Sequence, residues 1–359
     1  MGAAPFVLVR QRHSWRPRGW PRGWPLGWPR RRAAAASLAG LASLAGLASL
    51  AGVLGVCALA ASGCRAPAPP APPPVVRLTT GTPGAGFYPL GLALARAYSQ
   101  STPPLDVQVR DSAGSVANVE ALQRGDADIG LSYADVAYMA FVGRLEGRPQ
   151  AFSELRGIAV LELTPVHLVV RANSGIRDAA GLRGRRVGVG LPGSGSALTA
   201  DIVLAAIGID ASSARLEPLR YVDAGNRLAA GTLDAMFVTG GDPLASVRAS
   251  TGAGARLVPL AGPAIERLRH DYPFFRPTVI PGGTYPGHPD PIQTIGVDNL
   301  LVCRRSLDET LAHDLTARFF EGLPSLSMLT LMDLDQAPAT PIPLHDGAAR
   351  YYRERELSR

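Results

Sequence analysis

The residues best suited to binding chemistry lie in a few turns that are rich in glycine and serine. Each turn follows an apolar stretch typical of a strand and precedes a stretch typical of a helix. In an open α/β sheet such turns lie at the ligand-binding edge, and the free N–H groups of the following helix attract a carboxylate or phosphate. One such residue alone is typical of a turn or cap, but the set favours a shared ligand cleft. The residues are Gly84, Gly86, Ser115, Ser194 and Ser196.

Residues for acid–base, nucleophilic or metal chemistry are not grouped in this way. Ser194 lies in a Gly-Ser-Gly triplet rather than in the G-x-S-x-G elbow of α/β hydrolases. The segment 188–193 matches the dinucleotide pattern G-x-G-x-x-G, but Pro192 removes an N–H donor from its turn. We therefore predict a protein that uses no cofactor and no metal and is not an enzyme. The histidines after Cys64 are isolated, without metal-ligand spacing: His167, His270, His288, His313 and His345.

The elements that must position the turns alternate between strand and helix, which is typical of a parallel sheet with crossover helices. One unit, helix then glycine then Asp-initiated apolar strand, occurs at residues 122–132 and again at 228–238, about 106 positions later. We take the two copies as equivalent parts of two α/β lobes. Strands are expected at 75–79, 107–110, 128–132, 166–171, 186–190, 234–239 and 295–304, and helices at 89–99, 116–124 with Ser115 as N-cap, 197–207, 226–230, 311–323 and 348–356.

The first 63 residues are typical of an export signal and not of a folded domain. Eight arginines and no acidic residue are followed by a long apolar run, which ends in Ala60-Ala61-Ser62-Gly63 before Cys64. This pattern indicates a bacterial lipoprotein, cleaved before Cys64 and lipidated on it, and an uncleaved membrane anchor is the alternative. Residues 64–74 are nearly all alanine and proline, which predicts an extended tether.

The positive net charge of the chain comes from the predicted signal. Eight of the 36 basic residues belong to it, and the 28 that remain almost balance the 29 acidic residues. The mature chain therefore offers no basis for nucleic-acid binding. Cys303 is the one cysteine after Cys64, and its apolar neighbours predict a buried strand thiol. We expect lobe 1 at 75–165, lobe 2 at 166–290, and a return crossing with C-terminal helices that pack on lobe 1 at 291–359.

Five motifs in order resemble the TAXI group of TRAP-transporter solute-binding proteins. Gly81-Thr82-Pro83-Gly84-Ala85-Gly86-Phe87-Tyr88-Pro89-Leu90-Gly91 is similar to the opening G-T-G-x-x-G-x-Y-Y-P-x-G of that family, with Pro83 in place of a glycine and Phe87 in place of a frequent tyrosine. The other four are 114–118 (G-S-V-x-N), 182–196 (L-x-G-K-x-V, then G-x-P-G-S-G-[ST]), 234–243 (D-A-x-F, then G-x-P) and 283–287 (G-x-Y-P-G), after which His288 replaces a frequent glutamine.

The resemblance implies a periplasmic-binding-protein type II architecture with two lobes, hinge-crossing strands and a central cleft. It also implies a lipid-anchored periplasmic receptor that delivers a small carboxylated metabolite, an amino acid such as glutamate or a dicarboxylate, to a TRAP-type membrane permease. An exported serine hydrolase and a sensory lipoprotein are the alternatives. The ligand-binding residues expected on this basis are Gly84, Gly86, Tyr88, Ser115, Asn118, Gly193, Ser194, Gly195, Ser196 and Tyr285.

Overall fold

The computed structural model describes residues 75–83, 85–329 and 332–358. The predicted signal, the lipidation site Cys64, the tether and Gly84 lie outside the described residues. The described residues all belong to one compact unit. Within the described part of the chain, no helix combines the length and apolar character needed to cross a membrane.

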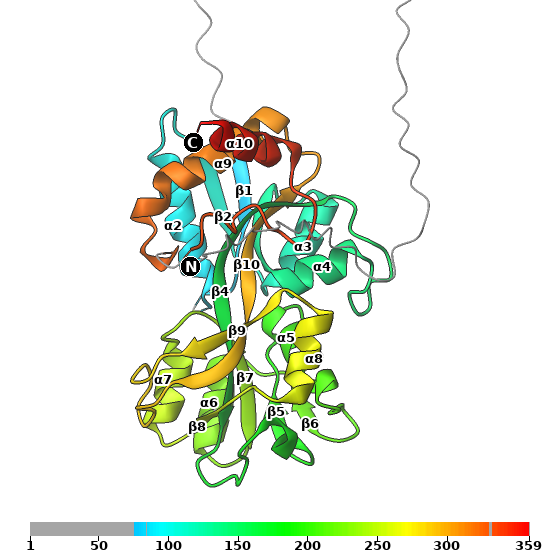
Figure 1. The fold of residues 1–359 in the computed structure, drawn as a ribbon, viewed down its shortest axis with the longest axis vertical. Coiled ribbons are helices and arrows are strands. Elements are labelled where there is room, and N and C mark those ends of the chain that lie inside the picture. Colours follow the sequence, from blue (N-terminus) through cyan, green and yellow to red (C-terminus); the bar gives the residue numbers. More distant parts are fainter. Residues whose placement is uncertain (1–74, 84, 330–331, 359) are drawn as a thin grey trace, which may run out of the picture. The chain divides into compact units, whose positions relative to one another are not determined.

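A ten-stranded sheet forms the centre of this unit (Figure 1). The strand order is β2-β1-β3-β10-β4-β7-β5-β6, and β8 and β9 pair with β4 and β10 respectively. The strands are β1 (Val75–Thr79), β2 (Asp106–Arg110), β3 (Ile129–Tyr133), β4 (Leu155–Val170), β5 (Arg186–Gly188), β6 (Arg215–Glu217), β7 (Ala235–Thr239), β8 (Arg256–Val258), β9 (Phe275–Ile280) and β10 (Ile292–Arg304).

Helices connect the strands and cover the sheet, as the alternating pattern predicts. β1 pairs in parallel with β2 and β3, and β5 pairs in parallel with β6 and β7. We call β1 to β3 with their helices the first half, and β5 to β7 with theirs the second half. The helices are α2 (Phe87–Ser99), α3 (Ser115–Arg124), α4 (Ala134–Phe141), α5 (Gly195–Ala206), α6 (Tyr221–Ala229), α7 (Ala245–Gly252), α8 (Pro263–Asp271), α9 (Glu309–Gly322) and α10 (Asp346–Leu357), with 3-10 turns at Ala179–Leu182, Leu323–Ser325 and Ser327–Leu329.

Two long antiparallel strands, β4 and β10, join the halves (Figure 1). β4 pairs with β10 up to Pro165 and then with β7 from Val166 onward. The sequence predicts a crossing strand only at 166–171, which misses the first part of β4 because a fully buried strand lacks alternation. β10 contains the strand expected at 295–304 and begins earlier, at Ile292. Cys303 is fully buried in β10, which confirms the predicted strand thiol.

The repeated sequence unit folds in the same way twice. Asp128, just before β3, accepts hydrogen bonds from the backbone N–H of Arg77 (2.9 Å) and from its guanidinium (2.8 Å). Asp234, just before β7, accepts the same two bonds from Arg186, at 3.0 and 3.1 Å. A second arginine completes each cluster from the end of a crossing strand, in the pairs Arg304 with Asp128 and Arg171 with Asp234.

These clusters hold their carboxylates in the charged form. Burial alone raises the pKa of Asp128, but the hydrogen bonds from Arg77 and Arg304 outweigh it and lower that pKa to about 2. The side-chain hydrogen bond from Arg186 lowers the pKa of Asp234 in the same direction. Each cluster therefore fixes one helix-to-strand junction by charge, and the helix before it ends in a left-handed glycine, Gly125 or Gly231.

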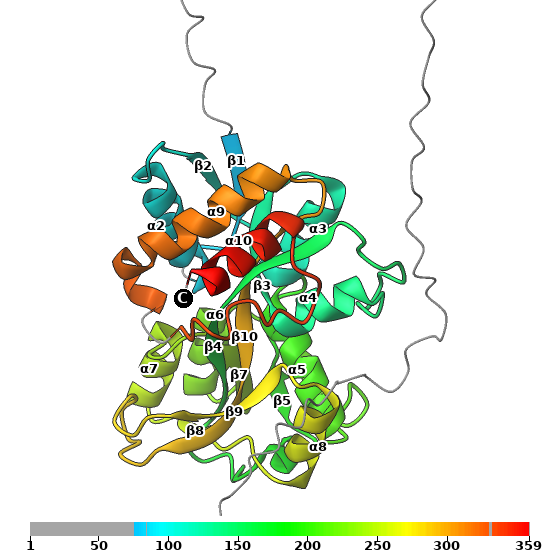
Figure 2. The same ribbon diagram turned by 45° about the horizontal axis from the view of Figure 1, so that its top comes forward.

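The C-terminal helices lie beside the first half. Figure 2 shows α9 and α10 next to each other there. The guanidinium of Arg318 in α9 donates to the hydroxyl of Ser101, just after α2, at 2.9 Å, and the hydroxyl of Tyr352 in α10 donates to the carbonyl of Ile158 in β4 at 3.0 Å. The last helix is therefore anchored to a crossing strand.

Candidate functional site

The first half contributes the start of α3. Gly114 precedes it with a φ of 120°, and Ser115 is the first residue of the helix rather than its N-cap, so the cap prediction is wrong. The hydroxyl of Ser115 instead accepts a hydrogen bond from the backbone N–H of Tyr133 at the end of β3 (3.1 Å). Ser115 is buried, and it therefore joins a helix start to a strand end.

The second half contributes the start of α5. Ser194 is the N-cap, and its hydroxyl accepts the N–H of Ala197 at 3.2 Å. Gly193 precedes it with a φ of 82°, a conformation that favours glycine. Ser196 in the first turn is buried, and its hydroxyl shares a hydrogen bond with the hydroxyl of Tyr221, the first residue of α6.

The structure brings these two helix starts into direct contact. The N–H of Ala117 in α3 donates to the carbonyl of Gly193 at 3.3 Å. A Cβ placed on Gly195 would lie 2.4 Å from Cδ2 of Tyr133 and 2.5 Å from the hydroxyl oxygen of Ser115. Only glycine fits this approach. Ser115 and the segment 193–196, far apart in sequence, therefore lie together.

Two tyrosines that the sequence analysis missed complete this junction. The hydroxyl of Tyr133 donates to the carbonyl of Thr239, at the end of β7, at 3.0 Å, and so links the two halves directly. The hydroxyl of Tyr221 donates to the same carbonyl at 3.1 Å and accepts the N–H of Thr239 at 3.4 Å. We call Ser115, Tyr133, Ser196, Tyr221 and Thr239 the junction cluster.

Asn118 supports this cluster from behind. Its side chain is fully buried, and its Oδ1 accepts hydrogen bonds from the hydroxyls of Thr79 and Ser112, both at 2.6 Å. Its Nδ2 donates to the carbonyls of Thr80 and Leu131. All of its hydrogen-bonding capacity is used within the protein. Asn118 therefore positions the ends of β1 and β3.

The opening motif meets the junction through a different aromatic residue from the one expected. Gly86 is exposed at the start of α2, and a Cβ on it would meet nothing within 4 Å. Tyr88 is half-buried. The ring of Phe87, in contrast, is buried and packs edge-on against the ring of Tyr133, with centroids 5.0 Å apart. Phe87 is thus the residue of this motif that touches the junction cluster.

Tyr285 lies in another part of the second half. It is buried, its hydroxyl accepts the N–H of Leu244 at 2.9 Å, and the same hydroxyl lies 3.0 Å from both Asp242 Oδ1 and His167 Nε2. Its ring belongs to an apolar cluster around α6 and α7. The hydroxyl therefore fixes the loop after β7. His288 is half-buried, and its Nε2 accepts the N–H of Leu257 at 2.9 Å.

Two carboxyl groups near the junction cluster have unusual environments. Burial raises the pKa of Glu162, in β4, to about 7. Burial also raises the pKa of Asp135, in α4, to about 6, against hydrogen bonds that include one from the hydroxyl of Thr199 in α5 at 2.6 Å. Neither residue belongs to a recognisable sequence motif, so only the structure identifies them. Among the described residues, no group of acidic, histidine or cysteine side chains is arranged to hold a metal ion.

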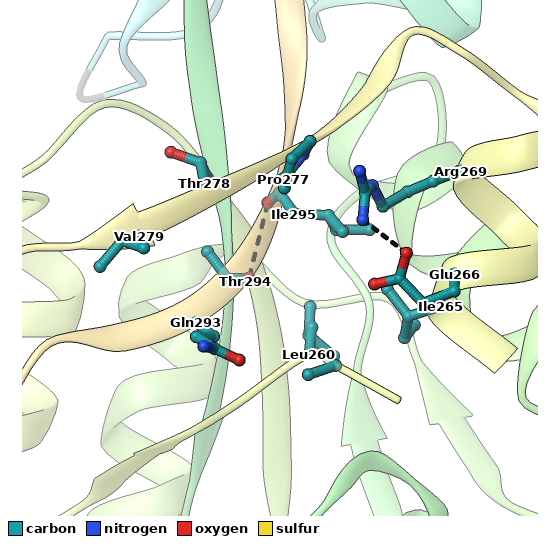
Figure 3. Close-up of a pocket in the computed structure, with 11 residues that line it drawn as sticks. Leu260, Ile265, Glu266, Arg269, Pro277, Thr278, Val279, Gln293, Thr294 and Ile295 are labelled. Carbon is teal, nitrogen blue, oxygen red and sulfur yellow. Dashed lines mark hydrogen bonds and ion pairs between the residues drawn. The ribbon is translucent and has the colours of Figure 1, made fainter. Parts of the chain in front are cut away.

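A separate cavity of about 320 Å³ lies between α8, β9 and β10 (Figure 3). Its walls are the apolar side chains of Leu260, Ile265 and Ile295 and an ion pair of Glu266 with Arg269 at 2.7 Å. None of the residues expected to bind ligand lines it. The cavity is therefore distinct from the junction cluster.

The fold recurs in solved proteins of low sequence identity. MatC from Rhodopseudomonas palustris, with bound malate, is 15% identical, with a TM-score of 0.51, over 79% of this chain and 97% of its own. A Xanthomonas citri protein bound to ATP is 12% identical, with a TM-score of 0.50, over 79% and 98%. The periplasmic aliphatic sulphonate binding protein SsuA from Escherichia coli is 15% identical, with a TM-score of 0.42, over 80% and 90%.

The likenesses to MatC and to the Xanthomonas citri protein fit the predicted α/β fold. The sequence matches the NMT1-like family from residue 78 to residue 355. This match covers both halves, both crossing strands and the C-terminal helices. The chain belongs to the NMT1-like family.

Proposed function

We propose that this protein is an extracytoplasmic solute-binding protein that holds a small carboxylated ligand between its two halves. The observation that carries the proposal is the direct contact of two helix starts, those of α3 and α5, from opposite halves. First-turn N–H groups carry partial positive charge and favour an anion. Two such starts facing one point can hold a carboxylate from both sides.

The contacts at this point suggest how a ligand enters. The carbonyl of Gly193 accepts the N–H of Ala117 across the junction. A ligand carboxylate can accept this N–H in place of the Gly193 carbonyl and so bind at the two helix starts. Closure of the halves on the ligand then follows from its higher affinity for the closed form, as a shift in population. β4 and β10 are the hinge in this scheme.

The finer parts of the proposal follow the sequence motifs. The resemblance to TAXI proteins supports delivery of the ligand to a TRAP-type membrane permease. The residues before β1 support lipidation at Cys64 and a tether at 64–74 that holds the domain near a membrane. We keep the lobe boundaries 75–165 and 166–290, with 291–359 returning to the first lobe. That the similar fold of MatC holds malate is consistent with a small organic acid.

A serine hydrolase would need a base beside Ser115, Ser194 or Ser196. In the described residues, each of these hydroxyls bonds to a backbone N–H or to Tyr221. The ring nitrogens of the buried His167 instead form hydrogen bonds with the carbonyl of Val238 and with Oδ1 of Asp242. This favours binding over hydrolysis. A sensory lipoprotein would use the same ligand site, and it differs only in the partner that recognises the closed form.

A thermal-shift panel of amino acids and small carboxylates tests the proposal. A ligand at one hundred times its Kd raises the free energy of unfolding by about 2.7 kcal/mol, so a true ligand is recognised by a shift that grows with concentration. Ser194→Ala removes the cap of α5 and should weaken binding by about 1 kcal/mol. Ser99→Ala, exposed at the end of α2, is the matched control. The absence of a shift with every panel member would contradict the proposal.

A further inference from the structure

We infer that the proposed ligand site includes a subsite for a positively charged amine, formed by Glu162 and Asn299. The ligand is then an amino acid or another zwitterion rather than a plain dicarboxylate. The inference rests on the proposed function and names the ligand class of that same site.

An irregularity in the crossing strands brings the two residues together. Asp298 of β10 pairs with Leu163 of β4, but Leu300 pairs with Val160, so β4 has one residue more than β10 in between. This β-bulge places Leu161 and Glu162 together opposite Asn299. Bulges re-aim side chains and are frequent beside binding sites.

The same strands connect this bulge to the junction cluster. Asn299 is the register partner of Tyr133 on β3, so Tyr133, Asn299 and Glu162 lie in one row across three neighbouring strands. On the other side, a Cβ on Gly241, in the loop after Thr239, would lie 3.8 Å from Oε1 of Glu162. The carboxyl group therefore lies where the two halves meet.

Hydrogen-bond acceptors at this place lack donors. Oδ1 of Asn299 is buried without a hydrogen-bond partner, and so is the hydroxyl oxygen of Thr239. Both residues are buried, at 5% and 3% exposure. Buried polar atoms are nearly always paired, so orphan acceptors at a candidate site indicate a missing donor.

Glu162 adds a charge that nothing in the described protein neutralises. No hydrogen bond or ion pair joins its carboxyl group to another described residue. Burial opposes its ionisation, which is why its pKa is raised to about 7. A cation placed beside it would lower that pKa and recover the energy of burial.

A protonated amine is the group that fits these requirements. It carries one positive charge and three N–H donors, and it can satisfy the Glu162 carboxylate and Asn299 Oδ1 together. With a carboxylate held at the starts of α3 and α5, the amine end of the same molecule lies toward β4 and β10. A dicarboxylate would instead bring a second negative charge to Glu162.

Calorimetric titration with matched ligand pairs tests this inference. Each pair shares a carbon skeleton and differs by the amine, as in glutamate and glutarate or alanine and lactate. Wild-type protein should bind the preferred amino acid at least about tenfold more tightly than its amine-free partner, the scale of one charged hydrogen bond. Glu162→Gln should remove most of this preference by weakening the amino acid, while the affinity for the amine-free acid stays the same or rises. Glu146→Gln removes the same charge from an exposed site and should change neither.

The outcomes separate the inference from the proposed function. Equal or tighter binding of the amine-free acid by wild-type protein overturns the amine subsite and leaves the solute-binding proposal standing. A preference that survives Glu162→Gln also overturns the subsite. Binding of neither series overturns both. Asn299→Ser, which keeps the strand intact, should reduce the preference in the same direction as Glu162→Gln.

Discussion

The two halves of the molecule are built on one frame and differ at the place where they meet. In each half, an aspartate before the central strand is held by two arginines, one from the neighbouring parallel strand and one from a crossing strand. In each half, the first residue of one helix uses its hydroxyl to accept the N–H at the end of that strand, Ser115 from Tyr133 and Tyr221 from Thr239.

The difference lies in the side chains that this frame presents. The first half offers a short serine and a long tyrosine, and the second half offers a long tyrosine and a short threonine at the equivalent positions. Both tyrosines reach the carbonyl of Thr239, so the junction is filled from both sides without a steric clash. Repetition therefore accounts for the frame, whereas the junction residues are where the two halves differ.

The largest expected effect comes from Gly195, where the halves approach most closely. The side chain of Gly195→Val would clash with the ring of Tyr133 and with the hydroxyl of Ser115, so the halves could not close. We expect ligand affinity to fall by more than about 100-fold, because closure provides the second half of the contacts. Calorimetric titration measures this. Gly252→Ala, at a site with nothing within 4 Å, is the control, and retained affinity in Gly195→Val would show that closure is not required.

Next in size is the loss of either aspartate of the frame. Asp128→Asn and Asp234→Asn each leave two arginines without their charged partner, and each should lower the free energy of unfolding by about 2–3 kcal/mol. Urea denaturation at neutral pH measures both. Similar losses would support the equivalence of the halves, and a silent variant in one half would break it.

The same clusters set the response to acid. The pKa of Asp128 is lowered to about 2, so its contribution to stability is complete above the unfolded value near 4 and is lost as the pH falls toward 2. Asp128→Asn should therefore differ most from wild type above pH 4 and least near pH 2. Denaturation curves at several pH values check this, and a gap that does not narrow in acid would contradict it.

Glu162 should show the opposite pH dependence. Its pKa is raised to about 7, so the folded protein binds more protons than the unfolded one between about pH 4.5 and 7, and stability falls as the pH rises through that window. Glu162→Gln should stabilise the unliganded protein by about 1–2 kcal/mol at pH 8 and leave it unchanged at pH 4. Thermal unfolding measures it, and a loss of stability at pH 8 would mean that the carboxylate has a partner within the protein.

The smallest effects are expected from the tyrosine hydroxyls. Tyr133→Phe removes one hydrogen bond across the junction, and Tyr221→Phe removes a hydroxyl that also serves Ser196 and the N–H of Thr239. We expect losses of about 1 kcal/mol for Tyr133→Phe and somewhat more for Tyr221→Phe. Denaturation curves of the two variants rank them, and the reverse order would contradict the assigned contacts.

The sequence predicts the elements of this fold better than their meeting points. Strand and helix periods, the glycines that end helices and the repeat at 122–132 and 228–238 are local patterns, and they place β1, β3, β7, α3 and α9 within a few residues. The first part of β4 was missed because it is buried on both faces. The cap role of Ser115 was wrong because a contact with Tyr133, a partner distant in sequence, competes with local capping.

The site was predictable only where a pattern repeats. Extending the alignment of the two copies by one residue pairs Tyr133 with Thr239, and extending it backward pairs Ser115 with Tyr221. The repeat therefore predicts the junction residues, which the family motifs alone do not. Glu162 and Asn299 have no such signal. Their position depends on the register of β4 and β10, which is set by pairing across most of the chain.

A crystal structure with the ligand identified in the panel would test the central claim most directly. The account predicts density between the starts of α3 and α5, with a carboxylate that accepts N–H groups from both helices and an amine beside Glu162. A ligand bound instead in the cavity beside Arg269, with the two helix starts still in mutual contact, would contradict it.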